Sequence, residues 1–155
     1  AAAMNQDPAL IIKEALQNIA DTMGALYAHG ARRFLVVNVP DIGKTPAVRL
    51  IPGASAGAEL LSQGFNQGLT LVVQGMNALP GNNVCILDVY SKLNEVIEQP
   101  AAFGFINATD ACVNPDKPPF ACIKPDTYVF WDGIHPTKAL HDIIAQQAIM
   151  VMTAP

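Results

Sequence analysis

The spacing of apolar residues along the chain predicts several amphipathic helices. Between residues 8 and 28, apolar side chains recur every three or four positions, which is the period of one helix face. Asp7 and Pro8 supply the N-cap and the first helical residue that such a helix favours. The same criteria predict further helices over residues 56–77, 91–98 and 136–152.

Two short, nearly continuous apolar runs predict strands that are buried on both faces. They cover residues 33–39 (RFLVVNV) and 84–90 (VCILDVY). Because helices and strands alternate along the chain, the strands are expected to be parallel and joined by crossovers, which gives a layered α/β fold. Two strands make an incomplete sheet of this kind. We therefore expect half of a domain, whose other strands come from an upstream portion or from another chain.

Residues 100–127 have no regular period and are rich in proline, so an irregular segment is predicted. Cys112 and Cys122 flank its central part, where a disulfide would hold a segment with little core of its own; two free thiols are the alternative. A disulfide implies an oxidising environment outside the cytoplasm. Cys85 lies in the second apolar run and is expected to be a buried thiol.

Composition narrows the classes of function. Hydrophobic residues make up 51% of the 155 positions and charged residues 14%, which predicts one domain with a well-filled core. The net charge of -4 argues against binding to nucleic acid, because phosphate binding needs a basic face. The apolar runs are too short for a transmembrane helix. Cysteine and histidine spacings suggest no zinc site, and neither a metal nor another cofactor is expected.

The stretch YVFWDGIHPTK at residues 128–138 carries the clearest chemical signal. Asp132 and His135 are three positions apart, in a loop before a helix that Pro136 is expected to begin. The carboxylate can accept a hydrogen bond from one imidazole nitrogen, which leaves the other to take a proton from a serine hydroxyl. Gly133 is expected to permit the tight backbone of this loop. Taken alone, the spacing would favour a helix cap and a surface histidine; the full string around it favours the catalytic interpretation.

The string F-W-D-G-I-H-P-T at residues 130–137 resembles the last conserved block of the GDSL or SGNH hydrolases. Residues 30–46 are similar to that family's fourth strand and following loop, and residues 103–112 to its bacterial esterase and lipase branch. The resemblance implies that residues 1–155 are the C-terminal portion of one three-layer α/β/α SGNH domain, flavodoxin-like with a parallel sheet. It also implies a bacterial protein that acts outside the cytoplasm.

The same resemblance implies a carboxylic-ester hydrolase that acts on a small-molecule or lipid ester through a Ser-His-Asp triad. Asp132 and His135 would be its catalytic aspartate and histidine. The serine, in a Gly-Asp-Ser block, and the Gly and Asn of the oxyanion hole belong to an N-terminal portion, so this chain alone should be inactive.

Three other functions fit parts of the sequence. An acyltransferase or a carbohydrate deacetylase could use the same triad, since the pocket selects the acceptor. A non-catalytic half-domain could complete the sheet of a partner chain through its exposed strand edges. The run G-A-S-A-G at residues 53–57 matches the nucleophile elbow of a different hydrolase fold, with Ser55 as the nucleophile, but that elbow needs a strand directly before it.

Overall fold

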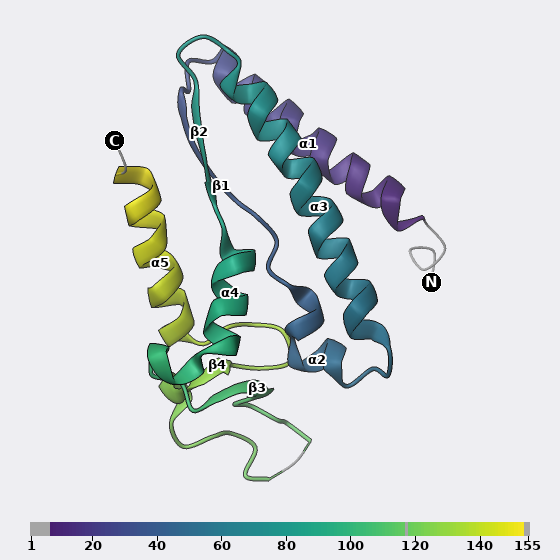
Figure 1. The fold of residues 1–155 in the computed structure, drawn as a ribbon, viewed down its shortest axis with the longest axis vertical. Helices are drawn as coiled ribbons and strands as arrows, with labels where there is room; N and C mark the ends of the chain where they lie inside the picture. Colours follow the sequence, from purple (N-terminus) through teal and green to yellow (C-terminus); the bar gives the residue numbers. More distant parts are fainter. Residues whose placement is uncertain (1–6, 117, 154–155) are drawn as a thin grey trace.

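The computed structural model describes residues 7–116 and 118–153 and is a mixed α/β structure with short parallel strands (Figure 1). One pair consists of β1 (Arg33–Val37) and β2 (Asn83–Leu87), and the other of β3 (Asn107–Ala111) and β4 (Tyr128–Phe130). The helices are α1 (Pro8–Ala28), α2 (Pro46–Arg49), α3 (Ala54–Asn77), α4 (Val89–Glu98) and α5 (Lys138–Thr153), with short 3-10 helices η2 (Ile42–Lys44), η3 (Pro100–Phe103) and η4 (Pro125–Thr127).

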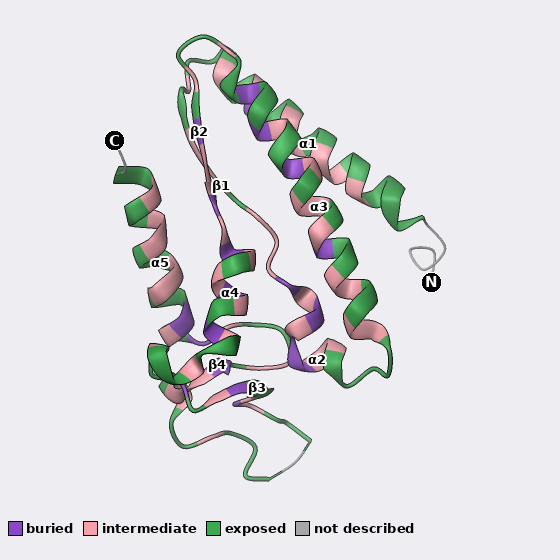
Figure 2. Ribbon diagram, viewed as in Figure 1, coloured by how far each residue is buried: buried purple, intermediate pink, exposed green. Residues whose placement is uncertain are grey.

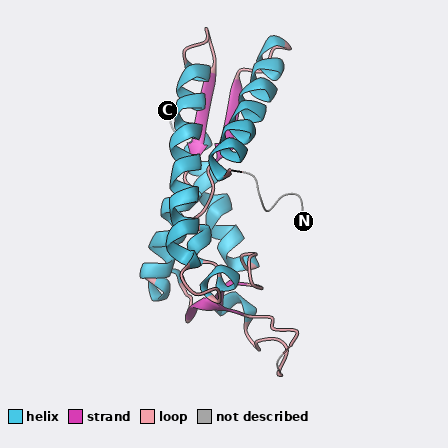
Figure 3. Cartoon of the chain, turned by 90° about the vertical axis from the view of Figure 1, so that its right-hand side faces the viewer, coloured by secondary structure: helices cyan, strands magenta, loops and turns pink. Residues whose placement is uncertain are grey.

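Helices cover both faces of the β1 and β2 pair. The two strands are in register from Arg33 opposite Asn83 onward, and successive side chains point to opposite faces. One set packs against α1 and α3 and forms a core cluster with Met23, Val73, Met76, Val84 and their half-buried neighbours. The other set lies near the end of α5, where the Arg33 guanidinium donates to the carbonyl of Met152 at 3.1 Å. Figure 3 shows the two strands lying among these helices.

A second core cluster lies at the other end of the molecule, between α4, α5 and the β3 and β4 pair. Its most deeply buried members are Val96, Val129, Phe130 and Leu140. α4 begins directly after β2 and packs into this cluster, so it connects the two cores. In Figure 2 buried positions alternate with exposed ones along α3, as expected of an amphipathic helix at the surface.

The predicted helices are present. α1 has the predicted bounds, and Asp7 caps it by accepting a hydrogen bond from the amide of Ala9 at 2.9 Å. α3 and α4 each start two residues before the predicted position. α5 starts later than predicted, because Pro136 forms a β-bridge with Phe130 instead of opening the helix.

The predicted strands are shorter and less buried than expected. β1 and β2 end at Val37 and Leu87, because the next residues turn out of the sheet to bond each other: Asn38 donates to the carboxylate of Asp88 at 2.8 Å. Asp88 then caps α4 through the amide of Ser91. Burial on both faces was predicted wrongly for β1, whose two end residues are exposed. Among the described residues, β1 has a strand neighbour on one side.

The segment 100–127 is more ordered than predicted, since it contains β3 and two 3-10 helices. β3 escaped prediction because its sequence NATDA has neither an apolar run nor an alternating pattern. The predicted disulfide between Cys112 and Cys122 is present. Cys85 is a free thiol as expected, but it is half-buried rather than buried. No helix within residues 7–116 and 118–153 is long and apolar enough to cross a membrane.

Candidate active site

A short loop between β4 and α5 brings Asp132 and His135 together. The amide of Trp131 donates to the carbonyl of His135 at 2.8 Å and closes the loop. One oxygen of Asp132, Oδ1, accepts from the amides of Ile134 at 2.8 Å and His135 at 2.7 Å. The other, Oδ2, lies 2.8 Å from His135 Nδ1. One carboxylate therefore shapes the loop and holds the imidazole.

These hydrogen bonds determine the charge of Asp132. The amides of His135 and Ile134 lower the pKa of Asp132 to about 2. Burial opposes them with a smaller effect, and the imidazole of His135 lowers the pKa further. The carboxylate is therefore ionised at neutral pH and can only accept hydrogen bonds. Because its Oδ2 faces Nδ1, a neutral imidazole must carry its proton on Nδ1, which leaves Nε2 as a free acceptor.

The pair is accessible from outside. The side chain of His135 is 70% exposed and that of Asp132 is 38% exposed. The free Nε2 of His135 can therefore reach a reacting group that arrives at the surface of the chain. This is the arrangement that a general base requires: a fixed tautomer, an ionised partner and an open nitrogen.

Gly133 is needed for a different reason from the one expected. Its φ is not among the positive values found at other glycines, so the backbone itself does not demand glycine. Instead, the loop lies against the start of α2: a Cβ at Gly133 would be 3.2 Å from Cβ of Ala47. The amide of Ala47 donates to the carbonyl of Gly133 at 2.9 Å. Sequence reasoning missed Ala47, because an alanine far from the motif carries no chemical signal.

The structure contradicts the nucleophile elbow at Ser55. Ser55 lies in the first turn of α3, after a turn and the short helix α2, with no strand leading into it. The chain has two other serines. Ser62 is buried and donates to the carbonyl of Ala58 at 3.1 Å, while Ser91 donates to Asp88 at 2.7 Å. No hydrogen bond joins any of these three described serines to His135.

The remaining polar candidates have structural positions. His29 caps the C-terminus of α1, and His141 is exposed on α5. Asp88 stands just after β2, and its contacts are those of a helix cap. Across residues 7–116 and 118–153, no group of three histidine, cysteine or acidic side chains is placed to hold a metal ion.

An apolar cavity of about 220 Å³ adjoins the loop. Ile134 and Pro136, which flank His135 in the sequence, form part of its wall. Val37, at the end of β1, and Leu140, in α5, line other sides. The cavity could take an apolar group next to the imidazole.

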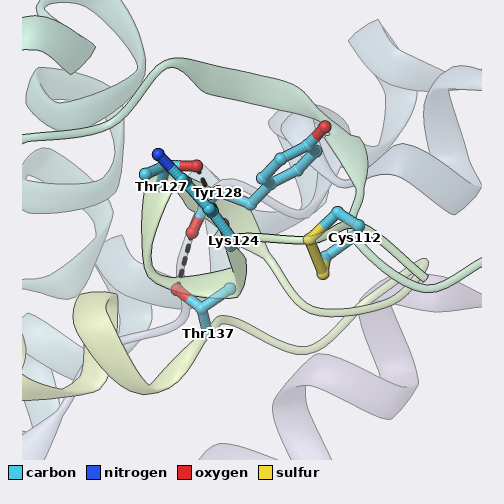
Figure 4. The surroundings of a disulfide bond; sticks show 6 residues. Cys112, Lys124, Thr127, Tyr128 and Thr137 are labelled. Carbon is cyan, nitrogen blue, oxygen red and sulfur yellow. Dashed lines mark hydrogen bonds between the residues drawn. A yellow bond between two sulfur atoms is a disulfide. The ribbon is translucent and has the colours of Figure 1, made fainter.

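The segment that carries the disulfide bonds to the chain where the loop begins. The amide of Cys112 donates to the carbonyl of Phe130 at 3.0 Å, and that of Val113 to Trp131 at 2.8 Å. Below the loop, the hydroxyl of Thr137 donates to the carbonyl of Tyr128 at 2.7 Å (Figure 4). The strand before the loop is thus fixed from two directions.

Comparison with known proteins adds an independent line of evidence. The model of the family described as GDSL-like Lipase/Acylhydrolase matches residues 4–148. The chain is 36% identical over 134 residues to GDSL esterase/lipase At1g73610 of Arabidopsis thaliana, covering 83% of the chain and 38% of that protein. It is 31% identical over 135 residues to GDSL esterase/lipase At5g45950 of the same plant, covering 80% of the chain and 38% of that protein.

Two consequences follow from these matches. The chain spans about two fifths of the length of these relatives (38%). These relatives are plant proteins, so the expected similarity to a bacterial branch is wrong.

Proposed function

The chain belongs to the GDSL-like lipase/acylhydrolase family, and we propose on this basis that it supplies the histidine and aspartate of a serine-esterase triad. His135 is the general base and Asp132 its partner. The observation that carries the proposal is the ionised carboxylate of Asp132, 2.8 Å from His135 Nδ1, with the opposite ring nitrogen exposed.

The proposed reaction is the hydrolysis of a carboxylic ester through an acyl-enzyme. Nε2 of His135 takes the proton of a serine hydroxyl as that oxygen attacks the ester carbonyl, and then gives the proton to the leaving alcohol. In the second half, Nε2 takes a proton from water as the water oxygen attacks the acyl-enzyme, and gives that proton to the serine oxygen as the acid leaves. Asp132 keeps the imidazole in the Nδ1–H tautomer and supports the imidazolium in both halves.

The nucleophile and the oxyanion donors come, in this proposal, from a portion of the family domain that lies outside this chain. The chain's own serines lie in helices or bond to other groups. We propose that residues 1–155 form the C-terminal portion of a single three-layer α/β/α domain of SGNH type. The helices on both faces of β1 and β2 support this, as does the free edge of β1 within the described residues.

The apolar cavity beside His135 favours a small-molecule or lipid ester over a strongly polar substrate. The disulfide supports a site of action outside the cytoplasm. The free edge of β1 also favours the second candidate, a half-domain that completes the sheet of a partner chain without catalysis.

The test is an ester-hydrolysis assay on the chain alone and on the chain produced together with its upstream portion. With a short p-nitrophenyl ester, the complete protein should be active and the chain alone inactive. His135→Ala should lower kcat of the complete protein at least about 1000-fold. His141→Ala, which changes an exposed histidine of α5, is the matched control and should leave kcat unchanged.

Each failure has a distinct meaning. Full activity in His135→Ala would show that His135 is not part of a catalytic triad. A complete protein that assembles but shows no hydrolysis would favour the non-catalytic half-domain.

A further inference from the structure

The loop that carries His135 has few contacts with the rest of the chain. Trp131, Ile134 and His135 are all exposed. The hydrogen bonds of Asp132 fix the shape of the loop, but they are internal to it and cannot fix its direction. The strand before the loop and the helix after it fix its two ends. Two backbone bonds join this loop to distant segments: the amide of Val113 donates to the carbonyl of Trp131 at 2.8 Å, next to β4, and the amide of Ala47 donates to the carbonyl of Gly133 at 2.9 Å, in the middle of the loop.

The start of α2 is suited to make this bond. The first amides of a helix have no partner within the helix. Pro46 opens α2 and has no N–H, so Ala47 presents the first free donor of the helix. Its bond to the carbonyl of Gly133 at 2.9 Å therefore does not replace a hydrogen bond within α2.

The approach is close enough to restrict both residues. A Cβ on Gly133 would lie 3.2 Å from Cβ of Ala47 and 3.8 Å from its Cα and amide nitrogen. A contact of 3.2 Å between carbon atoms is shorter than the optimum of about 3.5–4.0 Å. A side chain at Gly133 must therefore displace the loop or the start of α2 by a few tenths of an ångström.

The segment from Asp41 to Thr45, which turns into α2 and is called the corner below, is held by α3. Asp41 is 1% exposed and accepts from the amide of Gly43 at 3.0 Å, which shapes η2. A Cβ at Gly43 would overlap the carbonyl oxygen of Ser55 and lie 3.2 Å from the amide nitrogen of Glu59. The amide of Ile42 bonds to the hydroxyl of Ser62 at 3.3 Å. The first turns of α3 thus hold the corner in place.

We propose that Ala47 is a positioning residue for His135, which it controls through the carbonyl of Gly133. The segment from Asp41 to Ala47 transmits the position of α3 to the loop, so that Nε2 of His135 meets the attacking serine at the right place. This inference rests on the proposed function. The loop geometry that it predicts can be measured without catalysis.

The experiment is a double-mutant cycle at the contact. In the complete protein, Gly133→Ala should lower kcat about 10- to 100-fold with little change in KM, because a small displacement of a catalytic group costs that much. Ala47→Gly removes the opposing Cβ and should leave kcat near the wild-type value. The double variant should regain most of the lost kcat, since the new Cβ then has room. A purely structural loss at Gly133 would not be rescued from position 47.

The second readout separates this inference from the proposed function. In the 155-residue chain alone, the ¹⁵N resonances of the His135 ring respond to the surroundings of the imidazole as well as to its tautomer, so they report a displacement of the loop. Gly133→Ala should change them and the double variant should restore them. If the double variant restores the resonances but the complete protein has no esterase activity, the positioning role of Ala47 is supported and the catalytic triad is contradicted.

The inference fails if Gly133→Ala has wild-type kcat and ring resonances, or if the double variant is no better than Gly133→Ala. Should Gly133→Ala fail to fold, Ala47→Val crowds the same contact from the other side and should give the same loss of kcat. A wild-type kcat in Ala47→Val would then overturn the proposal.

Discussion

Single residues in this chain often serve two purposes, and Asp132 is the clearest example. Its Oδ1 binds two amides of its own loop, and its Oδ2 binds the imidazole of His135. The amides keep the pKa low, and the low pKa in turn keeps Oδ2 an acceptor. The negative charge of Asp132 is therefore stabilised mainly by amides of its own loop.

Replacing this carboxylate by an amide tests its effect on the tautomer. In Asp132→Asn, Oδ1 can still accept from the loop amides, but the amide nitrogen now faces Nδ1 as a donor. The imidazole must then carry its proton on Nε2, where it blocks general-base catalysis. We expect kcat of the complete enzyme to fall by about 10⁴-fold with folding retained. Asp142→Asn, at an exposed carboxylate of α5, is the control.

The low pKa of Asp132 predicts acid sensitivity of the loop. A carboxyl group whose pKa is about 2 in the folded chain and about 3.9 when unfolded stabilises the folded loop fully above about pH 4. This contribution is lost as the pH falls through 2. The amide resonances of Ile134 and His135 should therefore shift with a midpoint near pH 2. A midpoint near 4 would mean that the loop bonds do not form in solution, and Asp132→Asn should show no midpoint.

At the scale of elements, the ends of helices and strands explain most departures from the sequence prediction. Periodicity located α1, β1, α3, β2 and α4 because their apolar residues face a core. It placed the start of α5 wrongly, since Pro136 looks like a helix opener, yet it bridges to Phe130. β3 and α2 were not predicted because one lacks an apolar pattern and the other is a single turn. The Asp132–His135 contact could be predicted from spacing; the Ala47 contact could not.

Thr137 joins two elements, and its hydroxyl should matter more than its volume. The residue is 2% exposed, and its hydroxyl donates to the carbonyl of Tyr128 and accepts from the amide of Leu140. Thr137→Val keeps the shape but leaves that half-buried carbonyl without its donor. We expect a loss of about 1–3 kcal/mol in the free energy of unfolding, measured with denaturant. Thr137→Ser retains the hydroxyl and should lose less; equal losses would show that packing dominates.

Two glycines of α3 should respond differently to the same substitution. Alanine is favoured over glycine inside a helix by about 1 kcal/mol. No atom lies within 4 Å of a Cβ at Gly64, so Gly64→Ala should raise the free energy of unfolding by about that amount. At Gly68 a Cβ would overlap the side chain of Leu16 in α1. Gly68→Ala should therefore gain less or lose stability; equal gains would show that Leu16 moves freely.

At the scale of the whole molecule, the chain has two small cores connected by α4, and the candidate site lies beside the second one. β1 and β2 are fixed by α1 and α3, whereas the loop of His135 depends on β4, α5 and the corner before α2. Sequence patterns predicted the α/β class, because alternation of helices and strands is a global property. They did not predict the second parallel pair, whose strands are short and partly polar.

The disulfide should contribute to the stability of the molecule as a whole. Cys112 and Cys122 are 10 positions apart, and closing a loop of this size lowers the entropy of the unfolded chain. The double variant Cys112→Ala, Cys122→Ala should reduce the free energy of unfolding by about 2–3 kcal/mol. Cys85→Ala removes the free thiol instead and is the control, with a loss expected below about 1 kcal/mol. Equal losses would argue against the disulfide as the stabilising element.

The loop from Trp131 to His135 also has a consequence for protein engineering. The bonds that ionise Asp132 and orient His135 begin and end within five consecutive residues. The segment is therefore a candidate for grafting onto an unrelated scaffold whose strand is followed closely by a helix. The recipient would have to present two backbone donors where Val113 and Ala47 stand here, the second beside a gap just wide enough for glycine. Scaffolds could be screened for those two donors before any catalytic residue is introduced.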